Sequence, residues 1–363
     1  MELAERLNAV IDAAIGKRLV GCVVLVSRDG ESLYARAAGY ADREANKATS
    51  LDTIFRLASV TKPIVASAAL RMVDAGLLGL DDPVSKYLPF FTPKGPDGST
   101  PPILIRQLLT HSSGLAYSNV PPGVTTGTDP VDDFPLEENL RRMARGTLTF
   151  MPGTACQYGM SIDVLGGVIA AINGDVSDVQ SAVERYVTGP LGMTDTIFGV
   201  VDPSRLAVPY ADGKPEPVRM ADPQLVPTHD GAGAMNMSPG RIFKTNTAQC
   251  GGSGMAGTAG DFMKLVTAWQ SDFLKPATRD AALALQTGAL RMDPGMGYAF
   301  LGAFCDDPAP SGWGKGSVHW GGIWGNSWII QPETRTSVVA LTNTMWEGCN
   351  GPFTFETRDA VYP

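Results

Sequence analysis

The chain has 363 residues, of which 44% are hydrophobic and 18% are charged, and its formal net charge is −8. This composition is typical of a globular protein with one large domain or two closely packed ones. The acidic balance argues against nucleic acid as a partner, and the absence of a run of about 18 apolar residues argues against a membrane span.

The N-terminal segment predicts a helix followed by a strand hairpin. Apolar residues recur at helical spacing over residues 3–15, and Gly16 ends the pattern. The apolar run Gly21–Val26 and the segment Ser32–Ala38 flank a turn sequence at Ser27–Glu31. This arrangement indicates two strands joined by a turn.

Helical patterns dominate the middle of the chain, from about residue 60 to residue 187, between Pro- and Gly-rich loops at 91–102 and 119–135. The cluster Gly251–Gly254 indicates a loop whose backbone passes close to another group, although a plain flexible turn would have the same composition.

Strand patterns return towards the C-terminus. Ser327–Ile330 and Ser337–Leu341 flank a turn at Pro332–Thr334, and a terminal helix fits Phe353–Val361. Strands at both ends with helices between them predict an α+β fold of the α/β sandwich type. In this fold an antiparallel sheet from the N- and C-terminal segments is flanked by helices, and a mainly helical domain is inserted.

We place the domain boundaries so that residues 1–65 and 225–363 form the sheet-containing domain and residues 66–224 form the helical one. An active site is expected at the interface of the two domains, since ligand sites occur preferentially there.

The N-terminus and the cysteines favour a cytoplasmic location. Residues 1–6 lack the positive-then-apolar order of a secretory signal. The five cysteines are scattered and form no C-x-x-C motif, so we expect reduced thiols. The sequence does not indicate the oligomeric state.

The histidines, serines and glycines exclude several enzyme classes. There are only three histidines and no H-E-x-x-H motif, so a zinc hydrolase is not expected. No serine lies in G-x-S-x-G, which excludes the usual α/β-hydrolase elbow, and no phosphate-binding P-loop motif is present. We expect His111 and His229 to be structural.

Ser59-Val60-Thr61-Lys62 is the first candidate catalytic segment, at the start of an apolar helical pattern. A serine and a lysine three residues apart on a helix share one face, and free N–H groups at a helix start can hold an oxyanion. A lysine in a dry pocket can lose its proton and serve as a base for the serine. An N-cap serine followed by a surface lysine is the alternative, because this short pattern is common.

Tyr158 is the second candidate, in a turn that precedes another amphipathic helical pattern. From such a turn its phenol could face the Ser59 hydroxyl. A phenol needs a neighbouring cation to act as a base near neutral pH, and Lys62 would supply that cation. The alternative is an amphipathic residue at the edge of the core.

The segment His319–Gly325 is the third candidate. Its paired glycines, Gly321 and Gly322, would let a substrate lie directly against a strand. A backbone N–H here, opposite that of Ser59, would complete an oxyanion hole. The alternative is a tight glycine turn with two tryptophans packed in the core.

In this order, the three segments resemble the penicillin-recognising serine hydrolases. They are most similar to the family VIII carboxylesterases, whose fold resembles that of class C β-lactamases. The resemblance covers nearly the whole chain. Each motif alone is weak evidence for the family, but the motifs occurring together in this order are strong evidence. The other matching segments include Phe55–Pro63, Leu108–Leu115, Pro190–Met193 and Arg358–Tyr362.

The resemblance implies that Ser59 is the nucleophile, Lys62 its activating partner and Tyr158 the general base. The third family motif matches either His319–Gly321 or Trp320–Gly322. With the second register, the backbone N–H of Ile323 joins that of Ser59 in the oxyanion hole. The residues expected to contact substrate are Trp320, Gly321, Gly322, His319 and Tyr117.

Two departures from the β-lactamase pattern indicate the substrate. Met160 stands where an asparagine holds the β-lactam side chain, and Trp320 or His319 replaces the lysine that binds the β-lactam carboxylate. A site without that cation should bind carboxylates poorly, whereas an aromatic wall suits apolar groups. We therefore expect a serine carboxylesterase for short-chain acyl esters, with a small-molecule ester as its partner and no cofactor.

Alternatives on the same fold are a β-lactamase, a D-amino-acid peptidase or amidase, and an acyltransferase. The missing lysine and asparagine count against the first two. A non-catalytic penicillin-recognising sensor domain is a rival of another class, but the intact set of Ser59, Lys62 and Tyr158 argues against it.

Overall fold

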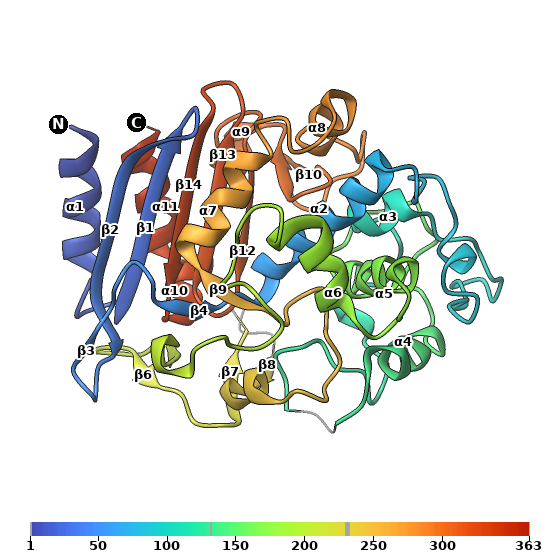
Figure 1. Cartoon of the computed structure of the whole chain (residues 1–363), viewed down its shortest axis with the longest axis horizontal. Coiled ribbons are helices and arrows are strands. Elements are labelled where there is room, and N and C mark those ends of the chain that lie inside the picture. Colours follow the sequence, from blue (N-terminus) through green and yellow to red (C-terminus); the bar gives the residue numbers. More distant parts are fainter. Residues whose placement is uncertain (1, 131–132, 229–232, 363) are drawn as a thin grey trace.

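A computed structural model describes residues 2–130, 133–228 and 233–362. Its centre is a large antiparallel sheet that joins the two ends of the chain, with the strand order β10-β11-β12-β13-β14-β1-β2-β3 (Figure 1). The predicted α+β fold, with one sheet built from N- and C-terminal segments, is therefore confirmed. The strands are β1 Gly21–Arg28, β2 Glu31–Asp42, β3 Lys47–Ala48, β10 Met296–Tyr298, β11 Ala303–Cys305, β12 Val318–Gly322, β13 Asn326–Gln331 and β14 Thr336–Thr342.

Helices cover both faces of this sheet. On one face, α1 (Leu3–Ala14) packs on α11 (Pro352–Val361), which follows the short α10 (Met345–Cys349). On the other face, α7 (Ala259–Ala268) lies against β1 and β14 (Figure 1). Because both faces are covered, β1 is buried along nearly its whole length and its sequence is a continuous apolar run rather than an alternating one.

Helices α2 to α6 pack beside the sheet, on the right in Figure 1, whereas the short α9 lies at the top near β13. The helix α2, which follows the 3₁₀ turn Ala58–Val60, packs on α5, and α5 also contacts α3, α4 and α6. Their bounds are α2 Thr61–Asp74, α3 Ile105–Leu109, α4 Leu136–Ala144, α5 Ser161–Asn173, α6 Val179–Val183, α8 Pro276–Ala282 and α9 Pro308–Ser311. The proposed domain boundaries stay a prediction.

Three two-stranded sheets complete the fold. The pair β4–β9 lies directly before the turn that carries Ser59, and β5–β6 and β7–β8 belong to the long segment between the helices and α7. The bounds are β4 Ile54–Arg56, β9 Ala256–Thr258, β5 Tyr210–Ala211, β6 Val218–Arg219, β7 Gln224–Pro227 and β8 Ala234–Met237.

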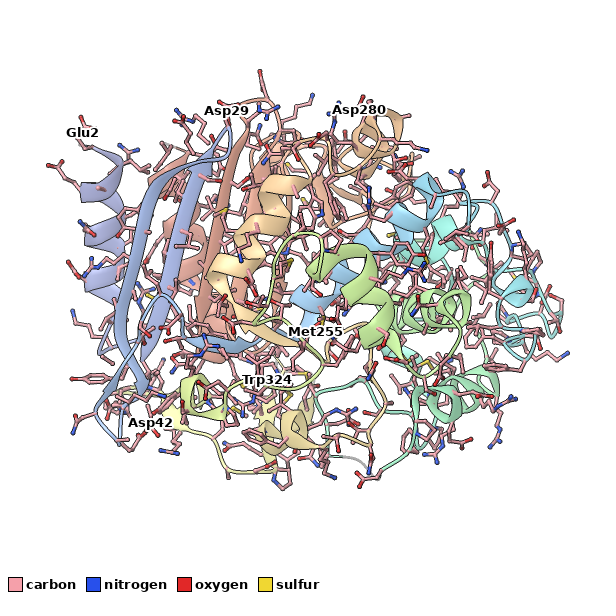
Figure 2. The ribbon with its side chains drawn as sticks, viewed as in Figure 1. Glu2, Asp29, Asp42, Met255, Asp280 and Trp324 are labelled. Atoms are coloured by element: carbon pink, nitrogen blue, oxygen red, sulfur yellow. The ribbon has the colours of Figure 1, made fainter. Side chains whose placement is uncertain are left out.

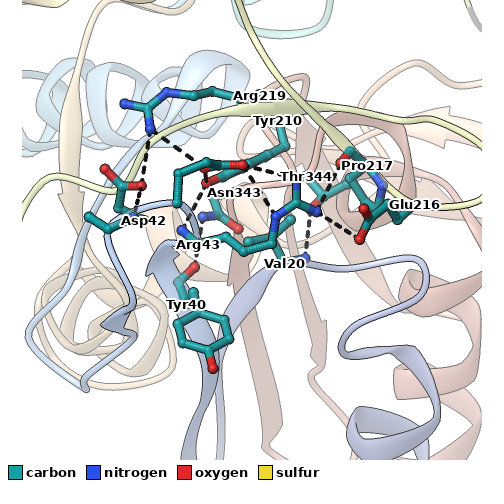
Figure 3. Close-up of polar contacts among 12 residues, drawn as sticks. Val20, Tyr40, Asp42, Arg43, Tyr210, Glu216, Pro217, Arg219, Asn343 and Thr344 are labelled. Carbon is teal, nitrogen blue, oxygen red and sulfur yellow. Dashed lines mark hydrogen bonds and ion pairs between the residues drawn. The ribbon is translucent and has the colours of Figure 1, made fainter.

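A polar network connects this long segment to the end of β2 (Figure 3). The Arg43 guanidinium donates to a carboxylate oxygen of Glu216 at 3.1 Å, and its backbone N–H donates to the Tyr210 hydroxyl at 2.9 Å. The Arg219 guanidinium donates to Asp42 at 3.1 Å. These contacts join β5 and β6 to the sheet over a separation of more than 160 residues in sequence.

Two local predictions differ from the structure. The first hairpin turn is shorter than Ser27–Glu31: only Asp29 and Gly30 lie between β1 and β2, both with positive φ (52° and 81°). Such a two-residue turn matches the twist of the flanking strands, so pairing extends further than the apolar pattern does. Gly321 and Gly322 belong to β12 itself rather than to a turn beside a strand.

Among the described residues, no helix is both long enough and apolar enough to cross a membrane.

The core between α7 and the sheet contains stacked aromatic side chains. Phe262 of α7 is 1% exposed, and its ring centroid lies 6.1 Å from those of Trp269 and Trp328. Phe262→Ala should lower the free energy of unfolding by about 3–5 kcal/mol, because it removes apolar burial and leaves a cavity. In urea unfolding, the control Phe243→Ala should lower the free energy of unfolding by less than about 0.5 kcal/mol, since Phe243 is 54% exposed. Equal losses in the two variants would contradict this packing argument.

Candidate active site

Ser59 lies in a strained turn at the start of α2. Ala58, just before it, has a φ of 44°, which is rare for a residue with a side chain. The turn is held from two sides. The Leu57 N–H donates to the Met255 carbonyl at 2.9 Å, and the Asn326 side-chain amide donates to the Arg56 carbonyl at 2.7 Å. These contacts fix the backbone from which the Ser59 side chain projects.

The strand β12 approaches this turn very closely. A Cβ on Gly322 would lie 2.2 Å from the Leu57 carbonyl oxygen, and a Cβ on Gly321 would lie 2.8 Å from the Cys349 carbonyl oxygen. Both positions therefore require glycine, for steric reasons. The paired glycines bring the backbone of β12 and of the following Ile323 next to Ser59.

The Ser59 hydroxyl is the meeting point of two polar side chains. The Tyr158 hydroxyl donates to Ser59 Oγ at 2.6 Å, and Lys62 Nζ donates to the same oxygen at 3.1 Å. Lys62 Nζ also lies 4.6 Å from the centre of the Tyr158 ring, so the ammonium is close to both groups. The structure thus brings together the three residues that the sequence selected for catalysis.

Lys62 is 3% exposed and is held by hydrogen bonds to oxygen atoms only. Besides Ser59, its ammonium donates to the Gly252 carbonyl at 2.7 Å and to the Tyr117 hydroxyl at 3.3 Å. Burial holds the pKa of Tyr117 well above its ordinary value, so this phenol stays protonated. Tyr117 therefore orients the ammonium without neutralising it.

A buried carboxylate stands behind Lys62. The Gly252 N–H donates to Asp163 Oδ1 at 3.0 Å, so the peptide group of Gly252 connects Lys62 to Asp163. A Cβ on Gly252 would lie 2.6 Å from Asp163 Oδ2. The glycine cluster is thus a loop whose backbone passes close to another group, here the Asp163 carboxylate. Burial raises the pKa of Asp163 to about 6, against the opposing effect of the Lys62 charge.

Tyr158 is positioned by aromatic rings and by its backbone. Its ring centroid lies 4.8 Å from that of His111 and 4.7 Å from that of Trp320. The Gly159 N–H donates to His111 Nδ1 at 3.3 Å, and Trp320 Nε1 donates to the Tyr158 hydroxyl oxygen at 3.2 Å. An indole N–H that donates to this oxygen favours negative charge on it.

A cavity of about 620 Å³ opens at Ser59 and is mostly apolar. His319, Trp320, Gly321, Ile323 and Tyr117 all line it, whereas Gly322 packs against the Leu57 carbonyl behind Ser59. Within the part of the chain that the structure describes, the N–H of Ile323 donates no hydrogen bond. The other lining residues include Val120, Thr126, Met235, Trp313, Trp346 and Thr354.

His319 supplies no cation to this cavity. Its ring stacks on Trp313 with centroids 3.7 Å apart, and burial lowers its pKa to about 3, so the imidazole is neutral near pH 7. His111 is likewise buried, with a pKa well below its ordinary value. His229 lies outside the described residues.

Sequence reasoning missed several residues of the site. Asp163 was hidden in an apolar helical pattern, where only its charge among hydrophobic neighbours could have drawn notice. His111 was assigned a structural role, yet its ring contacts Tyr158. Trp313 and Trp346 come from segments with no motif, and only the fold places them at the cavity. No group of three His, Cys, Asp or Glu side chains in the described ranges could hold a metal ion.

Comparison with known proteins gives a consistent result. The family model described as Beta-lactamase matches residues 7–349. Esterase EstB of Burkholderia gladioli is 46% identical over 99% of this chain and 95% of its own length. The resemblance to penicillin-recognising serine hydrolases is therefore confirmed.

Solved structures agree with this result. The structure of "EstCE1, a hydrolase with promiscuous acyltransferase activity" has a TM-score of 0.94 at 38% identity, covering 99% of this chain and 98% of that one. Simvastatin synthase (LovD) from Aspergillus terreus has a TM-score of 0.73 at 21% identity, covering 100% of this chain and 98% of that one, and it shares the fold.

The raised pKa of Asp163 predicts a measurable pH dependence of stability. Since its pKa is about 6 in the folded protein and 3.8 as the ordinary value, the folded state binds the proton more tightly, and Asp163 costs stability as the pH rises. The stability of Asp163→Asn relative to the wild type should increase by about 2 kcal/mol between about pH 4 and pH 7.

Urea unfolding at pH 4, 5, 6 and 7 measures this difference. Asp280→Asn, at an exposed position, is the charge-matched control. Parallel stability curves for the wild type and Asp163→Asn would contradict the prediction.

Proposed function

The chain belongs to the beta-lactamase family, and we propose that it is a serine carboxylesterase of the family VIII type that hydrolyses short-chain acyl esters. The observation that carries the proposal is the convergence of Tyr158 and Lys62 on Ser59 Oγ, at 2.6 and 3.1 Å, at the mouth of a mostly apolar cavity. The name of the 46% identical relative, Esterase EstB, supports the same activity.

In the resting state the Tyr158 hydroxyl donates to Ser59 Oγ, so the reactive form is reached when this phenol loses its proton to solvent. In the first step, Ser59 Oγ attacks the ester carbonyl carbon and passes its proton to the Tyr158 phenolate. Two groups stabilise the negative charge of the phenolate: the Lys62 ammonium lies close to the Tyr158 ring, and the Trp320 indole N–H donates to the Tyr158 oxygen. The tetrahedral oxyanion is held by the backbone N–H groups of Ser59 and Ile323. Tyr158 then returns the proton to the departing alcohol, which leaves Ser59 acylated.

In the second step, water attacks the acyl-enzyme. Tyr158 accepts a proton from the attacking water. It then gives this proton to Ser59 Oγ as the acid leaves, which restores the enzyme. An alcohol bound in the same apolar cavity can replace the water, and the product is then a new ester. Acyl transfer is therefore a second activity that the site could support, and the printed description of EstCE1 favours it.

The wall of the cavity favours esters over β-lactams. Trp320 supplies an apolar face and a single N–H that is used by Tyr158, and His319 is stacked and neutral. The described residues that line the cavity include no Lys or Arg, so none of them is placed there to bind a substrate carboxylate. An uncharged acyl or alcohol group is the better fit to this surface.

Ser59→Ala should abolish ester hydrolysis, with kcat/KM falling by at least about a thousandfold, because the acyl-enzyme cannot form. Hydrolysis of p-nitrophenyl acetate, butyrate and octanoate, run beside the β-lactam nitrocefin, measures this. Mass spectrometry should detect an acyl group on Ser59 in the wild type only. Ser32→Ala, at an exposed position in β2, is the control and should retain full activity.

Ester activity that survives Ser59→Ala would contradict the nucleophile assignment. Faster turnover of nitrocefin than of the esters would replace the esterase proposal by a β-lactamase.

Trp320→Phe tests the indole hydrogen bond separately from the aromatic wall. The variant keeps an aromatic ring but loses the N–H that donates to Tyr158 at 3.2 Å. We expect kcat for p-nitrophenyl butyrate to fall about tenfold, with KM changed less than about twofold, because the bond matters when the phenolate forms. A raised KM with an unchanged kcat would assign Trp320 to substrate binding alone.

A further inference from the structure

A second cavity lies beside the pocket of Ser59 and shares Ser253 with it. Its volume of about 40 Å³ exceeds what a single water needs. Met255 and Trp324, both labelled in Figure 2, form part of its wall. Among the described residues no Asp or Glu lines it, and its basic lining residues are Arg56, Arg241 and Lys244.

Arg56 is a buried cation that forms no ion pair within the described residues, although the negative charge of Asp222 acts on it. It is 8% exposed, and its guanidinium donates to the Pro239 carbonyl at 3.0 and 2.8 Å and to the Ala207 carbonyl at 2.8 Å. Burial lowers its pKa to about 10, so the side chain is still charged at neutral pH. Carbonyl dipoles compensate such a charge only in part.

Arg241 is a second buried guanidinium at the same cavity, 6% exposed. One of its terminal nitrogens, Nη2, donates to the Ala248 carbonyl at 3.1 Å. The other, Nη1, is buried and has no hydrogen-bond partner in the described structure. A buried charged donor that is left unpaired is costly, and it indicates a missing acceptor.

The nearby carboxylates form no ion pair with Arg56 or Arg241 in the described structure, although the charges of Asp222 and Asp163 act on these two arginines. Asp222 accepts hydrogen bonds from the Ser238 hydroxyl at 2.7 Å and from the Gly240 N–H at 2.8 Å. Asp133 lies 3.6 Å from Lys244, at the exposed end of that side chain. Polar side chains also line the cavity, from Ser238, Thr245, Thr247 and Gln249. The hydroxyls of Ser238 and Thr247 donate to Asp222 and to the Lys244 carbonyl, whereas Thr245 lies on the exposed side.

We propose that this cavity is a binding site for a small oxyanion such as inorganic phosphate or sulfate. Arg241 Nη1 donates to the anion from inside, the Arg56 guanidinium lies across from it, and Lys244 closes the outer side. An oxyanion satisfies the unpaired donor and compensates two buried positive charges at once. The site is separate from the ester-binding pocket, and the proposal does not depend on the esterase activity.

Isothermal titration calorimetry with sodium phosphate and sodium sulfate, in HEPES buffer at constant ionic strength, tests the proposal. We expect one saturable site per chain with a Kd of about 1 mM or tighter. Arg241→Met should weaken binding by at least about tenfold, because it removes a charged donor without shortening the side chain much. Arg145→Met, at an exposed position on the end of α4, is the matched control and should leave the Kd unchanged.

Lys244→Met and Thr245→Val keep the test valid if Arg241→Met does not fold, since both change the half-exposed side of the cavity. Each should weaken phosphate binding by about threefold or more. Titration with glycerol phosphate distinguishes a phosphate ester from free inorganic phosphate as the ligand. Binding of glycerol phosphate as tight as that of phosphate supports the site but makes a phosphate ester its ligand, whereas its exclusion supports the free anion.

Two results would overturn the proposal. The first is no saturable binding of phosphate or sulfate to the folded wild type, or binding that Arg241→Met and Lys244→Met leave unaltered. The second is competitive inhibition of p-nitrophenyl butyrate hydrolysis with the same affinity, which would place the anion in the Ser59 pocket. Either result would leave Arg56 and Arg241 with the single role of holding loop carbonyls.

Discussion

The close contact between β12 and the turn before α2 is the constraint on which the site depends. With glycine at 322, the strand can touch the Leu57 carbonyl, and Asn326 at the start of β13 then reaches the Arg56 carbonyl. This contact holds Ala58 in its strained conformation and fixes the direction of Ser59. It also brings together the backbone N–H groups of Ser59, in the turn before α2, and of Ile323, in the turn after β12.

Burial decides which groups around Ser59 carry charge. Lys62 brings a positive charge into a pocket of aromatic rings, where Tyr117 is held as a neutral phenol and His111 and His319 as neutral imidazoles. The Asp163 carboxylate reaches Lys62 only through the Gly252 peptide. A carboxylate in direct contact would hold the ammonium more tightly and weaken its effect on Tyr158. A peptide group between them keeps the geometry while it reduces the electrostatic attraction.

The sequence was sufficient for the fold class, because strand and helix periodicities are local properties. It was sufficient for the grouping of Ser59, Lys62 and Tyr158 because the order of its motifs resembles that of the penicillin-recognising serine hydrolases. It was insufficient where tertiary packing decides. Only the fold could show that the side chain of Trp320 donates to Tyr158, or that Trp313 and Trp346 share its cavity. The sequence predicts a hairpin turn longer than the observed turn at Asp29 and Gly30, because the polar residues at the strand ends still pair across the hairpin.

The loop from Ala248 to Met255 connects the cavity at Ser59 with the cavity at Arg241. On one side, the Gly252 carbonyl accepts the hydrogen bond of Lys62, and on the other side the Ala248 carbonyl accepts that of Arg241. The Met255 carbonyl accepts from Leu57 in the turn that carries Ser59. An anion that binds Arg241 would thus act on the same backbone that positions Ser59 and Lys62. Coupling between the two sites requires only that this loop have more than one arrangement, and its three carbonyl contacts are the points at which such a change would reach Ser59.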